Sequence, residues 1–342
     1  MQITTQLSGS RIIFYIILII IISSGLKLYT VDFSIPPHSD DFGYIIDSTQ
    51  YSQGDFFLNP RKNPGWSLVL SPFMAIINSD NFLDYTTLAK ILGIAISTIT
   101  IVPMYLLARR FFDEKYSLVA SCLFAFEPHL NYNSTLGLSE PIFIFTIILS
   151  AIFILQKNHN WYFYLSFLLG GIVWWIRPNG LIMVVILSII FFIVYKPSSK
   201  NFFKYLLCVA LFMIIVSPML IQRYDQFSDP LYVSYSVNFF MGDLRTWNSE
   251  NTKDIQYSAS DYIQDNGVIG FVERFGLTGF HNMALGIYKM LFPYLIVIVP
   301  FGVLFSIRAV DQNKDYIKSI WVFLLISLGS VVMMFAIWAD TR

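Results

Sequence analysis

Two short groups of ionisable residues in one polar segment have the chemical character of a reactive site. Asp40 and Asp41 are adjacent, and a carboxylate can act as a general base or bind a metal ion. Arg61 and Lys62 follow in the same segment, between two prolines. Both side chain types bind phosphate groups. The segment is therefore the first candidate for a catalytic or binding site.

Each group also has an explanation that involves no chemistry. Ser39 and Asp40 are favourable residues at a helix N-terminus, where an acid also complements the helix dipole. Because two adjacent carboxylates point in different directions at a helix start, one can cap the helix while the other reacts. Arg61 and Lys62 can equally contact lipid headgroups. The sequence leaves these alternatives open.

Three further charged residues are candidates for substrate binding. Arg177 ends an apolar segment, where an ionisable group is a functional hypothesis by default, although snorkelling to headgroups also explains it. Glu140 begins another apolar segment and either complements a helix dipole or belongs to the site. Arg245 lies near Trp247 in a segment rich in aromatic residues. Such rings suit sugar binding or a membrane interface, so Arg245 is a candidate for acceptor contact.

The composition of the chain is that of a polytopic membrane protein. Of its 342 residues, 56% are hydrophobic and 13% are charged, whereas soluble domains are about 25% charged. This excludes a soluble, disordered or disulfide-stabilised protein. The formal net charge of zero gives no general attraction for nucleic acid. Cys122 and Cys208 lie in apolar segments and are expected to be packed thiols.

Nine apolar segments are expected to cross the membrane as helices, since a crossing takes about 20 apolar residues. We therefore predict an all-α, polytopic helix bundle that forms one membrane domain over residues 1–342, with the chain continuing beyond Arg342. The predicted spans are 12–29, 84–107, 116–130, 138–155, 161–176, 179–195, 202–221, 285–307 and 319–338.

The distribution of Lys and Arg predicts the orientation. Ten of them lie in four short segments that total 33 residues, whereas six lie in two long polar loops that total 117. The positive-inside rule places the short segments and the N-terminus in the cytoplasm and both long loops outside. The short segments are 108–115, 156–160, 196–204 and 308–318, and the long loops are 30–83 and 222–284.

The elements that must position Asp40 and Lys62 are two predicted helices at the outer membrane interface. Apolar residues at helical spacing predict the first, which ends at Gly54 and Asp55. The second, over 66–77, is too short to cross the membrane. The residues that define the apolar face of the first helix are Phe42, Ile45, Ile46 and Thr49.

The order of these features resembles the C-type glycosyltransferase superfamily, and within it family 39. That family contains the dolichyl-phosphate-mannose protein mannosyltransferases and the aminoarabinose lipid A transferases. Two departures concern the acidic pair, which is often Asp-Glu in the family, and the Lys element, which usually precedes two prolines. The motifs are Asp40-Asp41, Lys62-Asn63-Pro64-Gly65, Leu138-Ser139-Glu140-Pro141, Trp175-Ile176-Arg177-Pro178 and the terminal Asp340-Thr341-Arg342.

The resemblance implies an inverting transfer of a sugar from a polyprenyl- or dolichyl-phosphate carrier to a lipid, glycan or protein acceptor. The reaction would occur at the extracytoplasmic face, of the plasma membrane in a prokaryote or of the endoplasmic reticulum in a eukaryote. By this resemblance Asp40, with Asp41 beside it, is the catalytic carboxylate that acts as a base and deprotonates the acceptor. Lys62 faces the carrier phosphate, and Arg177 assists. A divalent metal is left open as a cofactor.

Two functions of other classes are the alternatives. A lipid or solute transporter predicts charged residues inside spans and repeated halves with broken helices, whereas here the charges are taken to sit toward the ends of the predicted spans and the two halves do not match. A non-catalytic subunit of a glycan assembly complex predicts that changes at Asp40 leave activity intact and disrupt partner association. The sugar and the acceptor are not specified by the sequence.

Overall fold

The computed structural model describes residues 9–37, 39–59, 62–77, 79–156, 161–232, 257–291 and 314–338, together with residues 240, 299, 300, 302 and 304. Every regular element in these residues is a helix, which confirms the predicted all-α class. The chain divides into two compact units, residues 1–222 and 223–342. A single membrane domain over the whole chain stays a prediction.

Three helices of the described residues are long and apolar enough to cross a membrane. They are α1 (Gly9–Thr30), the pair α4 (Phe82–Ile99) and α5 (Ile101–Ala108), and α11 (Ser199–Phe227). The chain passes from α4 to α5 through Thr100, which keeps helical dihedral angles. The helix is interrupted there because Pro103 has no N–H to donate to the carbonyl of Ile99. These helices correspond to three of the nine predicted spans.

The other apolar helices of the first unit are shorter than a full crossing. One helix ends directly before Glu127, inside the predicted span 116–130, and another ends directly before Arg177, at the predicted end of its span. Residues 131–133 lie in a short helix whose N-terminus the Glu127 carboxylate caps. The count of nine spans stays a prediction. These helices are α6 (Glu114–Phe126), α7 (Pro128–Ser134), α8 (Glu140–Ile154), α9 (Tyr162–Ile176), η1 (Pro178–Leu181) and α10 (Ile182–Val194).

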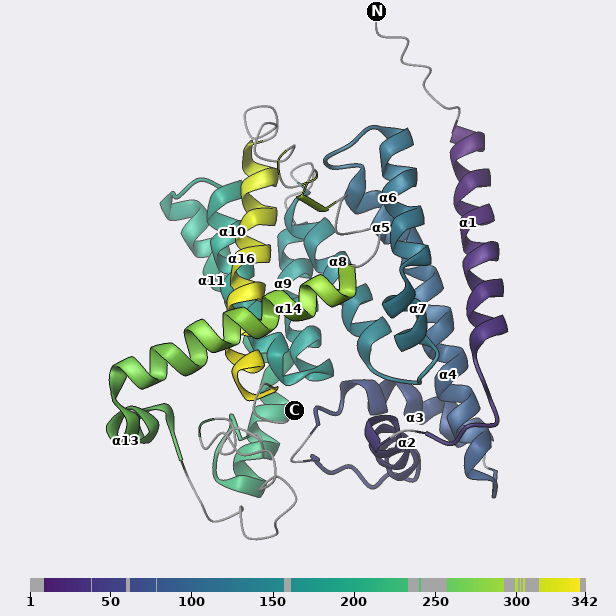
Figure 1. The fold of residues 1–342 in the computed structure, drawn as a ribbon, viewed down its shortest axis with the longest axis horizontal. Helices are drawn as coiled ribbons and strands as arrows, with labels where there is room; N and C mark the ends of the chain where they lie inside the picture. The colour runs from purple at the N-terminus through teal and green to yellow at the C-terminus, as the bar shows by residue number, and fades with distance from the viewer. Residues whose placement is uncertain are drawn as a thin grey trace, which may run out of the picture. The chain divides into compact units, whose positions relative to one another are not determined.

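The two predicted short helices are confirmed as α2 (Ser39–Ser52) and α3 (Gly65–Ile77). Figure 1 shows them running across one end of the long helices, next to the C-terminal end of α1. Of the predicted apolar face of α2, Ile45 is 1% exposed and Phe42 is 46% exposed, and the polar residues Asp41 and Ser48 are buried as well. The helix packs on α3 and α4 rather than on lipid alone, so protein contacts decide which face is covered.

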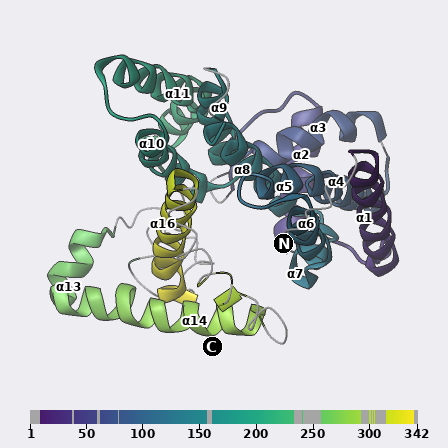
Figure 2. The same ribbon diagram turned by 90° about the horizontal axis from the view of Figure 1, so that it is seen from above.

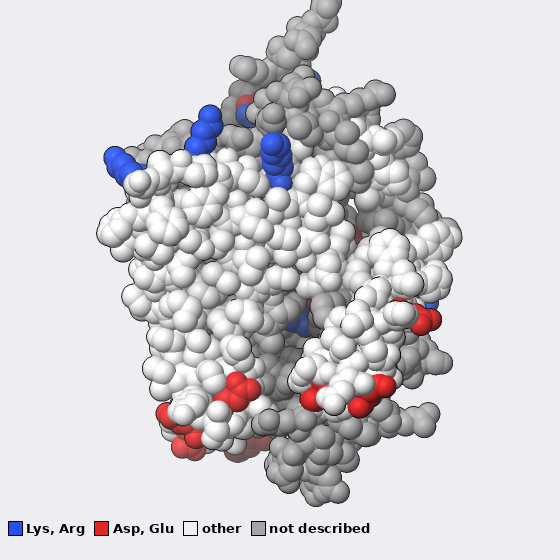
Figure 3. All heavy atoms as spheres, turned by 90° about the vertical axis from the view of Figure 1, so that its left-hand side faces the viewer, with Lys and Arg blue, Asp and Glu red and all other residues white. Residues whose placement is uncertain are grey.

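The basic links of the first unit lie away from α2 and α3. Figure 1 shows the α5–α6 and α10–α11 connections at the end of the unit opposite α2. At the left of Figure 3, white surface separates Lys and Arg side chains at the top from Asp and Glu side chains at the bottom. Lys200 and Asp225, near the two ends of α11, are both exposed. This separation agrees with the predicted orientation, and the identity of the outer face stays a prediction.

The second unit contains α13 (Ala259–Phe271), the π-helix η4 (Val272–Thr278), α14 (Gly279–Leu291) and α16 (Lys314–Trp338). Figures 1 and 2 show α14 lying across α16. The helices approach closely at Gly279, where a Cβ would clash with the carbonyl oxygen of Val332. The segment 222–284, predicted as an outer loop, is thus helical from Ala259 onward. Helix α14 begins before the predicted span 285–307, and most of the later part of that span lies outside the described residues.

Candidate functional site

The acidic pair opens α2, and its two carboxylates have different surroundings. Asp40 lies in the first turn with 77% of its side chain exposed. Asp41, one residue later, is 2% exposed. Successive residues on a helix point about 100° apart, so only one of the pair can face solvent here. Asp40 is therefore the acid that a substrate can reach.

Lys62 lies against the same turn of α2. Its ammonium is 3.5 Å from Asp40 Oδ1, donates a hydrogen bond to the Asp40 carbonyl oxygen, and stands 4.6 Å from the centre of the Tyr44 ring. The side chain runs beside Gly43, where a Cβ would come within 2.8 Å of Nζ. The absence of a side chain at Gly43 thus gives the ammonium its place next to Asp40.

The Lys62-Asn63-Pro64-Gly65 element is fixed on the C-terminal end of α9. Asn63 donates a hydrogen bond to the carbonyl oxygen of Trp174. A Cβ on Gly65 would lie 2.6 Å from the carbonyl oxygen of Trp175, so only glycine allows this approach. Trp175 in turn donates from its indole nitrogen to the carbonyl oxygen of Ile215 at 2.7 Å. These contacts set Lys62 beside the end of the helix that leads to Arg177.

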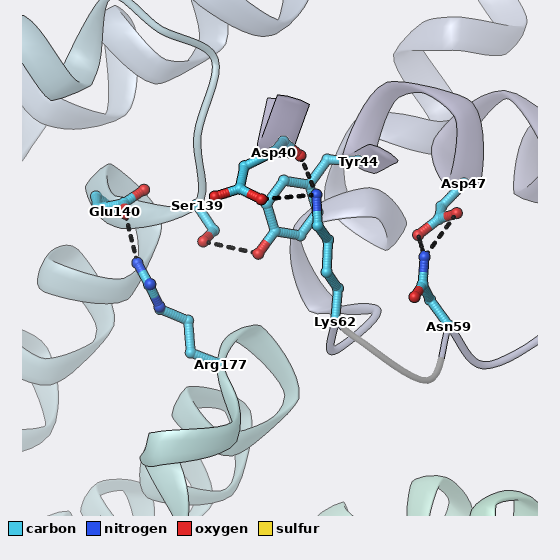
Figure 4. A network of polar contacts seen from close by, with 8 residues as sticks. All are labelled: Asp40, Tyr44, Asp47, Asn59, Lys62, Ser139, Glu140 and Arg177. Atoms are coloured by element: carbon cyan, nitrogen blue, oxygen red, sulfur yellow. Dashed lines mark hydrogen bonds and ion pairs between the residues drawn. The ribbon is translucent and has the colours of Figure 1, made fainter. Parts of the chain in front are cut away.

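A second ion pair lies in the same polar network (Figure 4). Arg177 Nη1 is 2.6 Å from Glu140 Oε1, at the N-terminus of α8. Residue Ser139, directly before Glu140, forms a 3.2 Å hydrogen bond with the hydroxyl of Tyr44. Tyr44 thus lies between the two pairs, with its ring near Lys62 and its hydroxyl on the α8 terminus. The network joins α2, the segment after it, α8 and the end of α9.

Burial shifts the pKa values of two ionisable groups on the α2 side of this network. Desolvation lowers the pKa of Lys62, while the nearby Asp40 carboxylate opposes that shift. Desolvation raises the pKa of Asp47, and hydrogen bonding from Asn59 together with the charge of Lys62 opposes it. The Asn59 amide is 3.1 Å from Asp47 Oδ2. The site therefore holds one buried acid and one cation that is largely removed from water.

Of the seven residues predicted for the site, the structure brings four into one network: Asp40, Lys62, Glu140 and Arg177. Asp41 is adjacent but turned inward. Arg61 and Arg245 lie outside the described residues. The described part of the chain holds no group of three His, Cys, Asp or Glu residues that could bind a metal ion.

Three contributors were missed in the sequence: Tyr44, Asp47 and Ser139. Tyr44 and Asp47 follow Asp40 at i+4 and i+7, so the three lie on one face of α2. This polar stripe could have been found beside the apolar pattern. Ser139 was part of a quoted motif, but its partner on α2 depends on tertiary packing.

Part of the chain is similar in sequence to a known protein family. Residues 62–222 match the family model described as dolichyl-phosphate-mannose-protein mannosyltransferase, and the match ends at the last residue of the first unit. A search of curated proteins gives no match. The matched region contains Lys62, Glu140 and Arg177.

Solved structures share the fold at low identity. The apo oligosaccharyltransferase of Archaeoglobus fulgidus is 15% identical with a TM-score of 0.61, over 96% of this chain and 50% of that chain. The oligosaccharyltransferase AglB from the same organism, in complex with an inhibitory peptide and a dolichol-phosphate, is 13% identical with a TM-score of 0.60, over 94% and 50%.

The S. cerevisiae protein O-mannosyltransferase Pmt1–Pmt2 complex bound to the sugar donor is 15% identical with a TM-score of 0.53, over 72% of this chain and 38% of that chain. The chain thus spans half or less of the length of these proteins. The predicted resemblance to family 39 is confirmed over residues 62–222, and the solved structures show that the chain shares their fold.

Proposed function

We propose that the protein is an inverting glycosyltransferase that moves a sugar from a polyprenyl- or dolichyl-phosphate carrier to an acceptor hydroxyl at the extracytoplasmic face. The observation that carries the proposal is the convergence of Asp40, Lys62 and the Glu140–Arg177 pair in one network (Figure 4). An acid beside one cation, with a second cation in the same network, suits a reaction in which a hydroxyl loses a proton and a phosphate gains charge.

Asp40 is the proposed general base. The acceptor hydroxyl oxygen attacks the anomeric carbon while the bond from that carbon to the carrier phosphate breaks, and the hydroxyl proton passes to the Asp40 carboxylate. Attack from the side opposite the phosphate inverts the configuration at the anomeric carbon. The exposure of Asp40 leaves room for an acceptor to approach it. General acid–base catalysis of this kind contributes about 10²–10⁴-fold.

Lys62 and Arg177 are the proposed phosphate contacts. Each is paired with a carboxylate in the structure, and the phosphate becomes a stronger anion for both as its bond to the sugar breaks and it gains a second negative charge. When Lys62 transfers its hydrogen bonds from Asp40 to the phosphate, Asp40 loses its counter-ion and becomes a better proton acceptor. The burial of Lys62 strengthens its field on the leaving phosphate, because a cation acts more strongly away from water.

The donor and acceptor follow from the matched family. Its description names dolichyl-phosphate mannose and a protein, so a polyprenyl-phosphate mannose and the Ser or Thr hydroxyls of a polypeptide are the proposed substrates. The two long loops are then outside the cytoplasm, where α2 and α3 carry the site. A lipid or glycan acceptor is the other outcome of an acceptor screen.

The test is transfer of labelled mannose from polyprenyl-phosphate mannose in membranes that contain the full-length protein. We expect Asp40→Asn and Asp40→Ala to lower transfer at least about 100-fold, in line with loss of a general base. Asp55→Asn is the matched control, since Asp55 is an exposed acid just beyond α2 and should retain activity. Full transfer by both Asp40 variants would exclude Asp40 as the base. In a separate assay, counterflow of solute through reconstituted vesicles would favour a transporter.

A further inference from the structure

Lys90 is a buried cation on α4 that the proposed chemistry does not use. Lys90 is 4% exposed. Its ammonium donates hydrogen bonds of 2.8 Å to the carbonyl oxygen of Asp32 and 2.9 Å to that of Ile35. Both acceptors belong to the segment that links α1 to α2, more than fifty residues away in sequence. Lys90 therefore ties a membrane-spanning helix to the backbone directly before the acidic pair.

Two carboxylates act on the same ammonium. The charges of Asp41 and Asp32 both attract Lys90, and Asp41 is the buried member of the acidic pair. The Asp32 carboxylate is itself fixed by hydrogen bonds from the backbone and hydroxyl of Ser34, at 2.8 and 2.6 Å. Lys90 thus faces the chain on both sides of the α2 start: the linking segment before it and the first turn after it.

We propose that Lys90 is a positioning residue for catalysis, which acts through Asp41 and the 32–35 backbone to fix the first turn of α2 and hence Asp40. The inference rests on the proposed function. It assigns the acidic pair two different tasks. Asp40 faces the substrate and Lys62, whereas Asp41 faces inward and locks the turn against α4.

Because Lys90 is buried, the loss of one of its contacts costs free energy. A lysine ammonium in a buried site needs its donors satisfied, and here two backbone carbonyl oxygens accept hydrogen bonds from it. Removal of the ammonium leaves the carbonyl oxygens of Asp32 and Ile35 without that donor and takes away a positive charge that acts on Asp41. The segment before α2 then relaxes, and Asp40 moves with it. Because misplacement by about 1 Å can cost roughly 100-fold in rate, the effect should fall on kcat.

The experiment measures kcat, the KM for polyprenyl-phosphate mannose and the binding of polyprenyl phosphate for the full-length protein. We expect Lys90→Met to lower kcat about 10- to 100-fold while KM and polyprenyl phosphate binding change less than about threefold. Lys90→Arg, which keeps the charge and the donors, should recover most of the rate. Asp41→Asn should lower kcat in the same way, and its effect should not add to that of Lys90→Met.

Lys27→Met is the matched control. Lys27 is also buried, at 1% exposure, but its ammonium donates to Ser23 within α1, and we expect kcat to stay within threefold of wild type. Wild-type kcat in Lys90→Met would overturn the proposal, as would a parallel loss of donor binding, which indicates general disruption. If Lys90→Met does not fold, Asp41→Asn decides: wild-type kcat there also overturns it. An active Asp40→Asn would instead refute the proposed function, so the two failures are distinguishable.

Discussion

The contact between Gly43 and Lys62 allows a test in which stability and activity should move in opposite directions. Gly43 lies inside α2, where alanine is more favourable than glycine by about 1 kcal/mol. A Cβ at this position would lie 2.8 Å from Lys62 Nζ, 3.4 Å from Cε and 3.7 Å from Cδ. These atoms are the far end of a flexible side chain, so Gly43→Ala should fold and be as stable as wild type or more so.

The size of the functional effect follows from the same contact. An ordinary contact distance is about 3.5–4.0 Å, so the ammonium must move by roughly 1 Å. That move takes it away from Asp40, from which it stands at 3.5 Å, and from the proposed phosphate position. A displacement of this size can cost about 100-fold in rate. We therefore expect Gly43→Ala to lower kcat/KM about 10- to 100-fold.

The assay is mannose transfer from polyprenyl-phosphate mannose, with thermal unfolding measured in detergent on the same preparation. Gly25→Ala is the control, because it places an alanine in α1 where a Cβ meets no atom within 4 Å, and it should keep full activity. Wild-type kcat/KM in Gly43→Ala, at unchanged stability, would refute the assignment of Lys62 to its place beside Asp40.

Three further predictions follow from the contacts and charges of the site. Gly65→Ala should sharply lower the yield of folded protein, because the new Cβ would meet the Trp175 backbone, which cannot move as a side chain does; a normal yield and melting temperature would contradict this. Because burial lowers the pKa of Lys62, its ammonium loses a proton as pH rises before an ordinary lysine does. Polyprenyl phosphate affinity should therefore fall toward alkaline pH below the usual lysine range, and Lys62→Arg should abolish that decline. Since burial raises the pKa of Asp47, its ionised form destabilises the fold and stability falls as pH rises through that pKa. Asp47→Asn should raise the melting temperature at neutral pH, with a difference that shrinks as pH falls, and a pH-independent difference would show that charge is not the cause.

The sequence predicted the helices around the site well because their signals are local. The spacing of Phe42, Ile45 and Ile46 predicts α2, and Arg177-Pro178 predicts the end of α9. The buried face of α2 was predicted less well. Polar residues such as Asp41 and Ser48 are covered by α3 and α4, and such coverage depends on tertiary packing that a hydrophobic pattern does not encode.

The pairing of the charged residues was beyond sequence reasoning for the same reason. Glu140 and Arg177 were both candidates, but their 2.6 Å contact depends on how α8 and α9 pack side by side. Lys90 was not singled out because it lies within an apolar span, and its partners are backbone carbonyls, which have no sequence signature. The close approach of Lys62 to α2 depends on Gly43, whose importance appears only when the two segments are seen together.

The most direct test of the central claim is a structure of the full-length protein with bound polyprenyl phosphate. The phosphate should lie within hydrogen-bond distance of Lys62 Nζ and the Arg177 guanidinium, with Lys62 drawn away from the Asp40 carboxylate and Asp40 open to the acceptor side. A phosphate that contacts neither cation, while the Asp40–Lys62 and Glu140–Arg177 ion pairs both stay intact, would contradict the proposed role of this network.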